Sequence, residues 1–219
     1  MDRRHSKPER VGPRFVLVTP AIEDAASFAP KLAAACRAGD VAAVVLRLVP
    51  AGDSELLARA RVLVPEAQAT GAALLFGGLI HLVAAAAADG VHVANATAVQ
   101  SARSTVTPSR IVGTGGLALR HDAMVAAEGG ADYVMFGEPD VDGRRTGLPA
   151  LIERVTWWAE LFEIPCVAFA GRIDEIPALV QAGADFIALG DEVIWNAPEG
   201  PSAALAAATL RLGAAEPVQ

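Results

Sequence analysis

The chain repeats one pattern along its length: a short run of aliphatic and β-branched residues is followed by an Ala-rich segment whose apolar residues recur at helical spacing. Several helical segments end in glycine just before the next run, where a residue that tolerates positive φ ends a helix at little cost. The pattern predicts eight strand–helix units. Strands are predicted at residues 15–19, 42–47, 72–76, 90–93, 110–114, 133–136, 166–169 and 186–189, and helices at residues 24–38, 54–70, 79–88, 96–104, 120–129, 147–162, 174–182 and 201–212.

Continuous apolar runs are typical of strands buried on both faces of a parallel sheet. Right-handed strand–helix–strand units form either an open doubly wound sheet or a closed barrel, and eight units favour the barrel. We therefore predict an α/β fold, a (β/α)8 TIM barrel with a parallel eight-stranded sheet. We expect one barrel domain at residues 15–212, a disordered basic tail at residues 1–14 and a C-terminal tail at residues 213–219.

Charge and hydropathy narrow the function classes. No apolar stretch reaches the roughly 20 residues needed to span a bilayer, and residues 1–14 carry charges where a secretory signal has an apolar core. Those residues hold 5 of the 18 basic side chains but only 2 of the 25 acidic ones, so the predicted barrel is acidic, which argues against a nucleic-acid surface. Cys36 and Cys166 lack metal-binding spacing. We expect a cytoplasmic protein with no membrane or nucleic-acid partner.

An Ala-Asp phrase recurs between a predicted helix and the strand that follows it. The aspartates are Asp89, Asp132 and Asp185. They lie at the start of their strands, whereas chemistry in this fold gathers at the opposite, C-terminal ends. We therefore predict that these carboxylates bind backbone N–H groups at the N-terminal end of the barrel and take no part in catalysis.

Glycine follows most of the predicted strands, at the end of the barrel where active sites of this fold lie. Exposed backbone N–H groups in such turns can hold an anion, and the loops after the seventh and eighth strands often bind phosphate. Tight strand-to-helix connections need glycine as well, with or without a ligand. The candidates for ligand or phosphate binding are Gly113, Thr114, Gly137, Ala170, Gly171 and Gly190.

Two polar side chains end otherwise apolar strands. Arg47 follows a continuous apolar run, and because an unpaired buried charge is costly it must reach solvent, a carboxylate or a bound anion. Anion binding and a structural ion pair explain Arg47 equally well. His92 ends the fourth strand and could face a ligand, although a hydrogen-bonded histidine inside the barrel accounts for it equally well.

Other chemistry has little support in the sequence. Carboxylates near the predicted mouth of the barrel lie on two separate loops, and their spacing does not define a metal site, so no metal ligands are predicted. No arrangement of Ser, His and Asp or of Cys and His indicates a nucleophile. The carboxylates are Glu138, Asp140, Asp142, Asp191 and Glu192.

Trp157 and Trp158 are adjacent in a predicted helix, so they cannot both face the core along one helical stripe. One ring could lie at a contact between subunits, or it could be covered by a neighbouring part of the chain.

Five phrases occur in a fixed order: Ala-Asp-Gly-Val-His-Val at 88–93, Ile-Val-Gly at 111–113, Gly-Ala-Asp-Tyr-Val-Met-Phe-Gly at 130–137, Ile-Pro-Cys-Val-Ala at 164–168 and Ala-Gly-Ala-Asp at 182–185. In order and spacing they resemble the thiamin phosphate synthases and the related thiazole tautomerases, from about residue 15 to residue 195. The resemblance implies the TIM barrel and a role in thiamin biosynthesis. Thiamin phosphate synthases are transferases that join a pyrimidine pyrophosphate to a thiazole phosphate.

The resemblance also carries particular residues. Arg47 matches an arginine that the family has at the end of the second strand, and Arg145 is the basic residue left where the family has a lysine loop. With His92 they are the catalytic candidates. The family reaction uses magnesium, but Gly78 and Thr97 stand where its two carboxylate ligands are expected. The resemblance is therefore to a divergent member of the family that lacks most of the motif residues.

Three hypotheses follow from the sequence. The chain could act as a thiamin phosphate synthase in which arginines replace the lost metal and lysine charge. It could be a different small-molecule enzyme on the same barrel, using Arg47, His92 and the acidic loop at residues 138–142. It could also be a non-catalytic binding or regulatory protein. Each implies a small phosphorylated or heterocyclic ligand, and the resemblance suggests a homodimer. The arginines of the first hypothesis are Arg47, Arg144, Arg145 and Arg172.

Overall fold

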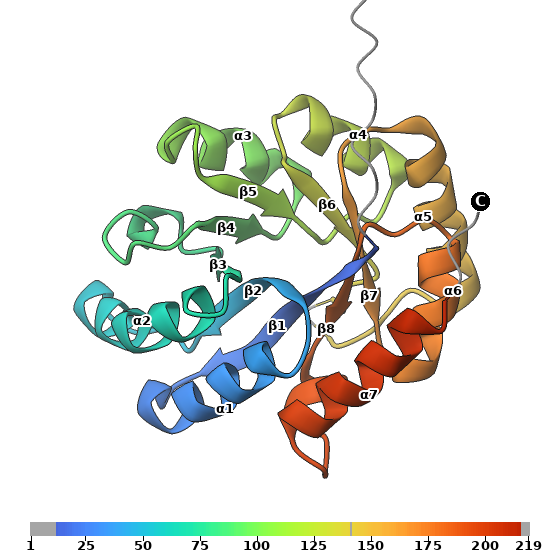
Figure 1. Ribbon diagram of the computed structural model, residues 1–219. Helices are drawn as coiled ribbons and strands as arrows, with labels where there is room; N and C mark the ends of the chain where they lie inside the picture. Colours follow the sequence, from blue (N-terminus) through green and yellow to red (C-terminus); the bar gives the residue numbers. More distant parts are fainter. Residues whose placement is uncertain (1–11, 141, 216–219) are drawn as a thin grey trace, which may run out of the picture.

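The computed structural model describes residues 12–140 and 142–215. Its eight parallel strands pair in chain order and close into a barrel, with β1 hydrogen-bonded to β8, so the predicted TIM barrel is confirmed (Figure 1). Most of the predicted tail at residues 1–14, and residues 216–219, lie outside the described residues. The strands are β1 (Arg14–Ile22), β2 (Val41–Leu48), β3 (Ala73–Gly77), β4 (Gly90–Val93), β5 (Ile111–Thr114), β6 (Tyr133–Phe136), β7 (Cys166–Ala170) and β8 (Phe186–Leu189).

The helices surround the strands, and α7 lies beside α1 where the ring closes (Figure 1). Among the described residues, none of the helices is both long and apolar enough to cross a membrane. The α-helices are α1 (Ala25–Arg37), α2 (Asp53–Gln68), α3 (Ala96–Thr105), α4 (Arg120–Glu128), α5 (Leu148–Leu161), α6 (Ile176–Gln181) and α7 (Pro201–Gly213). Shorter helical turns are η1 (Ile80–Leu82), η2 (Ile173–Glu175) and η3 (Asp191–Trp195).

The prediction of a helix at residues 79–88 is wrong. Only the short turn η1 forms there, and the chain continues through further turns into β4. Ala87 adopts a left-handed backbone with φ of 54°, which an α-helix does not accommodate. The high helix propensity of the alanine run is overridden because the chain must turn back within a few residues to enter the barrel at Gly90. The helix predicted at 174–182 is shorter than expected, and η3 was not predicted.

The core has two layers. Side chains that point outward from the strands pack against the helices in one large apolar cluster. Side chains that point inward form a smaller cluster inside the barrel, which fills the space between the strands. The residues of this inner cluster are Val16, Val18, Val45, Leu75, Tyr133, Met135, Val167, Phe169 and Ala188.

The repeated aspartates join strands in pairs at the N-terminal end of the barrel, as predicted. Asp89 precedes β4, and its carboxylate accepts a hydrogen bond from the Leu74 backbone N–H in β3 at 2.8 Å. Asp132 precedes β6 and binds the Val112 N–H in β5 at 2.7 Å. Asp185 precedes β8 and binds the Cys166 N–H in β7 at 2.9 Å. Each aspartate also donates its own backbone N–H to a carbonyl of the same partner residue, so the preceding strand is held twice. The donations run from Asp89 to Leu74, from Asp132 to Val112 and from Asp185 to Cys166.

The two adjacent tryptophans differ in burial. Trp158 is fully buried, stacks on Phe162 and donates its indole N–H to the Ile164 carbonyl at 2.8 Å. Trp157 is half-buried and packs against Phe162, with the Arg120 guanidinium 4.9 Å from the centre of its ring. Side chains of the same chain therefore cover part of Trp157, and the rest of the ring stays exposed in the single chain.

Replacing Asp132 with Ala tests the aspartate contacts. We expect Asp132→Ala to lower the free energy of unfolding by about 1–3 kcal/mol, because the buried Val112 N–H loses its partner. Urea denaturation followed by circular dichroism measures the change. Glu199→Ala, in an exposed loop, is the control and should stay within about 0.5 kcal/mol of the wild type. Equal stability of the two variants would contradict this role for Asp132.

Candidate functional site

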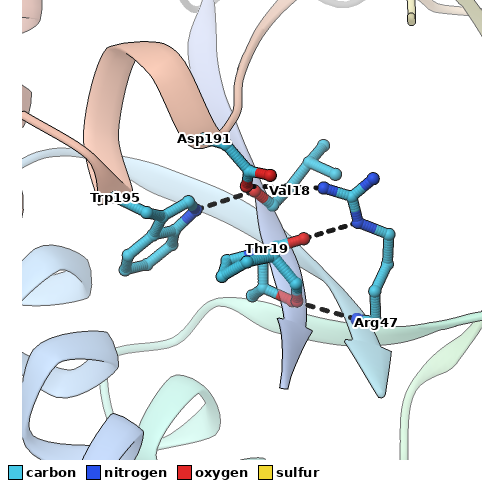
Figure 2. A network of polar contacts seen from close by, with 6 residues as sticks. Val18, Thr19, Arg47, Asp191 and Trp195 are labelled. Atoms are coloured by element: carbon cyan, nitrogen blue, oxygen red, sulfur yellow. Dashed lines mark hydrogen bonds and ion pairs between the residues drawn. The ribbon is translucent and has the colours of Figure 1, made fainter. Parts of the chain in front are cut away.

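Arg47 is held at the mouth of the barrel by Thr19. The pairing of β1 with β2 is irregular between Val18 and Ala21, where Pro20 has no N–H to donate. The buried Thr19 hydroxyl accepts the backbone N–H of Arg47 at 3.0 Å, and the Thr19 carbonyl accepts the Arg47 Nε (Figure 2). Both the backbone and the side chain of Arg47 are thus fixed by one residue.

The guanidinium of Arg47 faces a carboxylate. Its Nη2 lies 3.5 Å from Asp191 Oδ1, a long contact between side chains that are 42% and 39% exposed (Figure 2). Asp191 begins η3, and the last residue of that turn, Trp195, donates its indole N–H to the Val18 carbonyl at 2.7 Å. Burial raises the pKa of Asp191 and Glu192 adds to this, whereas Arg47 opposes it. The pair is loose, and part of the Arg47 charge still faces solvent.

A second polar group lies inside the mouth, centred on His92. Its Nδ1 lies 2.8 Å from the Tyr133 hydroxyl, and its Nε2 lies 3.3 Å from Glu138 Oε2. The three residues come from β4, from β6 and from the turn after β6. His92 is 5% exposed and the side chain of Glu138 is 18% exposed, so the group is almost closed off from bulk water. Sequence reasoning placed Tyr133 in a strand but gave it no part in the site.

Two glycines make room for this network. A Cβ on Gly113 would lie 1.9 Å from Tyr133 Cζ, so only glycine lets the phenol cross β5 toward His92. A Cβ on Gly115 would lie 2.0 Å from Glu138 Oε2 and 2.8 Å from His92 Nε2. Gly113 was predicted to bind a ligand, and in the structure its missing side chain gives space to Tyr133.

The electrostatics fix which atoms carry protons. Burial alone would raise the pKa of Glu138, but the hydrogen bond and charge of His92, together with Arg47, hold it below its ordinary value. Burial, with Glu138 and Asp132 nearby, raises the pKa of Tyr133, so its phenol keeps its proton. An ionised carboxylate only accepts hydrogen bonds, so His92 donates from Nε2 to Glu138. Glu138 thus holds a negative charge at the mouth.

Arg145 forms a second cationic group, at the end of β7. Its guanidinium lies over Gly171, where a Cβ would come 1.4 Å from Nη1. Nη2 donates to the Phe169 carbonyl at 3.1 Å and to Glu175 at 3.0 Å. The Glu175 carboxylate also accepts the Gly171 N–H at 2.8 Å. An internal carboxylate therefore occupies the backbone group that the sequence suggested for phosphate. Among the described residues, Arg145 Nε is a buried polar atom without a hydrogen-bond partner.

Four other predicted site residues are buried or tightly packed against neighbouring parts of the chain. Thr114 is fully buried and its hydroxyl donates to the Gly115 carbonyl at 3.2 Å. Ala170 is fully buried at the end of β7. Gly137 has φ of 83°, and a Cβ there would lie 2.7 Å from Leu151 Cδ2. A Cβ on Gly190 would lie 2.7 Å from the Phe169 ring. Arg47, His92 and Glu138 are thus the polar residues of the candidate site, while these four residues are packed closely against their neighbours.

Neither position where the resemblance places a magnesium carboxylate carries one, because these positions are Gly78 and Thr97. Among residues 12–140 and 142–215, no three His, Cys, Asp or Glu side chains are grouped so that they could hold a metal ion. Gly78 turns the chain with φ of 79° and donates its N–H to the His92 carbonyl. The Thr97 hydroxyl donates to Asn95 Oδ1 at 2.8 Å, beside the start of α3. Both positions where the resemblance placed carboxylates are taken up by these contacts.

Comparison with known proteins decides the family. The family model described as thiamine monophosphate synthase matches residues 15–193. The chain belongs to the thiamine monophosphate synthase family. A thiamine-phosphate synthase of Rhodospirillum centenum is 46% identical over 196 residues, covering 88% of this chain and 94% of the relative. A thiamine-phosphate synthase of Hyphomonas neptunium is 36% identical over 200 residues, covering 88% and 90%.

Solved structures agree on the fold of this thiamine monophosphate synthase family member. Thiamine phosphate pyrophosphorylase from Pyrococcus furiosus superposes with a TM-score of 0.76 at 22% identity, covering 92% of this chain and 96% of that one. A 3-hexulose-6-phosphate synthase superposes with a TM-score of 0.66 at 18% identity, covering 90% and 98%. At such low identity the likeness extends to the barrel alone.

The charge on Glu138 should make stability depend on pH. A carboxyl whose pKa falls on folding stabilises the protein above its unfolded-state pKa, and that contribution is lost as pH falls through the folded value. The ordinary value for Glu138 is 4.5. We expect wild type to exceed Glu138→Gln in free energy of unfolding at about pH 7, and the difference to shrink between about pH 5 and pH 3. Urea titrations at several pH values measure it; a difference that stays constant would contradict the ionised state.

Proposed function

We propose that this protein is a transferase of the thiamin phosphate synthase type, with its site at the C-terminal mouth of the barrel. The observation that carries the proposal is the Arg47 guanidinium, which is anchored through Nε to the Thr19 carbonyl and is 42% exposed. A fixed and partly solvated cation at the active-site end of a TIM barrel is suited to bind a phosphorylated ligand. Because the chain belongs to the thiamine monophosphate synthase family, we take this phosphorylated ligand to be a substrate of the family reaction.

In the proposed anion site, a pyrophosphate group takes the place of Asp191 beside the Arg47 guanidinium. Arg47 meets Asp191 at 3.5 Å, and a pyrophosphate group would offer shorter charge-assisted hydrogen bonds to the same nitrogens. Asp191 opposes such a ligand only while it is ionised. Because its pKa is raised by burial, this carboxyl takes up a proton more readily than an ordinary aspartate.

In the family reaction the bond between the pyrimidine methylene carbon and the pyrophosphate oxygen breaks, and both electrons leave with the oxygen. The lone pair of the thiazole nitrogen forms the new carbon–nitrogen bond. Negative charge therefore grows on the leaving group, where Arg47 can stabilise it, and positive charge grows on the pyrimidine. Among the side chains of this chain, the Arg47 guanidinium is the one that we assign to the charge on the leaving group.

A direct test uses the purified full-length protein with the pyrimidine pyrophosphate and the thiazole phosphate, across a series of magnesium concentrations. We expect thiamin phosphate to form. Arg47→Ala should lower kcat/KM by about 100-fold or more, the usual cost of removing one donor that stabilises transition-state charge. Product is quantified by chromatography after oxidation to a fluorescent derivative.

The matched control is Arg61→Ala, which removes an exposed arginine from α2 outside the mouth. It should leave turnover within about twofold of wild type, since exposed substitutions rarely change the folded structure. Arg47→Ala must also keep the wild-type circular dichroism spectrum. Absence of product from wild type, or equal turnover by both variants, would overturn the proposal.

A second candidate function, ligand binding without catalysis, is favoured by the ion pair of Arg145 with Glu175. Both side chains are largely buried, at 25% and 12% exposure, and the pair occupies the Gly171 N–H. Under this alternative, wild type would bind pyrophosphate at the mouth and yet form no thiamin phosphate.

A further inference from the structure

The carboxylate of Glu138 has one oxygen committed within the protein. Oε2 accepts the hydrogen bond from His92, whose other nitrogen is held by Tyr133. No hydrogen bond from a described residue reaches Oε1. The side chain is 18% exposed, so this second acceptor is reachable from the mouth even though the carboxylate is mostly buried.

Several neighbouring residues stabilise the negative charge of the Glu138 carboxylate or make room for it. His92 on β4 donates a hydrogen bond, and Arg47 on β2 contributes positive charge. On β6 the Tyr133 phenol is neutral. Gly115 after β5 leaves the space that the carboxylate fills, because a Cβ there would come within 2.0 Å of Oε2. Four strands therefore cooperate to hold one negative charge in a confined space.

A mostly buried carboxylate with a free acceptor selects for a ligand that is positively charged or donates an N–H, and against an anion. We propose that Glu138 is a specificity-determining residue that accepts a hydrogen bond from a protonatable aminoheterocycle, and that it stabilises positive charge on that ring. The inference rests on the proposed function, since it assigns the two ends of the mouth to the two ends of one substrate. Arg47 binds the phosphates and Glu138 binds the ring.

This division of charge fits the chemistry of the reaction. Positive charge that grows on the pyrimidine as pyrophosphate leaves would be met by Glu138, while Arg47 meets the negative charge on the leaving group. Tyr133 acts as a positioning residue, because it touches Glu138 only through His92. The phenol holds the imidazole, and the imidazole in turn fixes the direction of the carboxylate.

The test measures binding of the aminopyrimidine half of thiamin as its free alcohol, which carries no phosphate and cannot react. Isothermal titration calorimetry compares wild type with Glu138→Gln and with Glu192→Gln. The control removes the same charge from an exposed position at the same mouth. We expect Glu138→Gln to raise the dissociation constant at least tenfold and Glu192→Gln to change it less than twofold. Equal affinity of the three proteins, or no binding to wild type, would overturn the inference.

A second measurement does not depend on how well the variant folds. Glu138 stays ionised between about pH 5 and 8, because its pKa lies below the ordinary value. Binding to wild type should therefore weaken as pH rises through the pKa of the aminopyrimidine itself, when the ring loses its proton. Affinity that is flat across this range would contradict recognition of a cationic ring.

The two proposals can fail separately. If the aminopyrimidine binds wild type in the expected way but no thiamin phosphate forms, the proposed transferase activity is wrong and the assignment of Glu138 stands. If thiamin phosphate forms while Glu138→Gln binds the aminopyrimidine as wild type does, the assignment of Glu138 is wrong and the transferase activity stands.

Discussion

The rest of the structure depends on how the parallel strands are held in register at the N-terminal end of the barrel. Asp89, Asp132 and Asp185 each bind the first part of the preceding strand through a carboxylate and through their own backbone N–H. A parallel sheet has no tight hairpins to set its register, so these contacts supply local constraints instead. Once register is set at one end, the residues that leave the strands at the other end have fixed neighbours.

The mouth of the barrel follows from that register. Gly113 of β5 lies opposite Tyr133 of β6 and His92 of β4 in the strand pairing, so its missing side chain opens the path between them. Arg47 lies beside Asp191, Arg145 forms an ion pair with Glu175, and Glu138 accepts a hydrogen bond from His92. Under the proposed function, a ligand replaces one of these partners or uses an acceptor that they leave free.

The sequence predicts most of the fold because apolar runs and glycine-ended helices are local signals. It fails at residues 79–88, where helix propensity gives way to the turn into β4. In the site, Arg47 and His92 stand out because polar side chains are unusual at the ends of apolar strands. Tyr133 and Glu175 do not stand out, since a tyrosine in a strand looks like core and Glu175 lies 30 residues from the arginine it binds. The glycines at 113 and 115 were a signal for close approach, but nothing local identifies what approaches them.

We propose that Arg47 exchanges its carboxylate partner, Asp191, for an anionic ligand. A crystal structure of the full-length protein soaked with pyrophosphate tests this most directly. We expect pyrophosphate oxygens within hydrogen-bond distance of the Arg47 guanidinium, with Asp191 turned away and the Thr19 contacts kept. Pyrophosphate bound elsewhere on the barrel, with the Arg47–Asp191 pair intact, would contradict it.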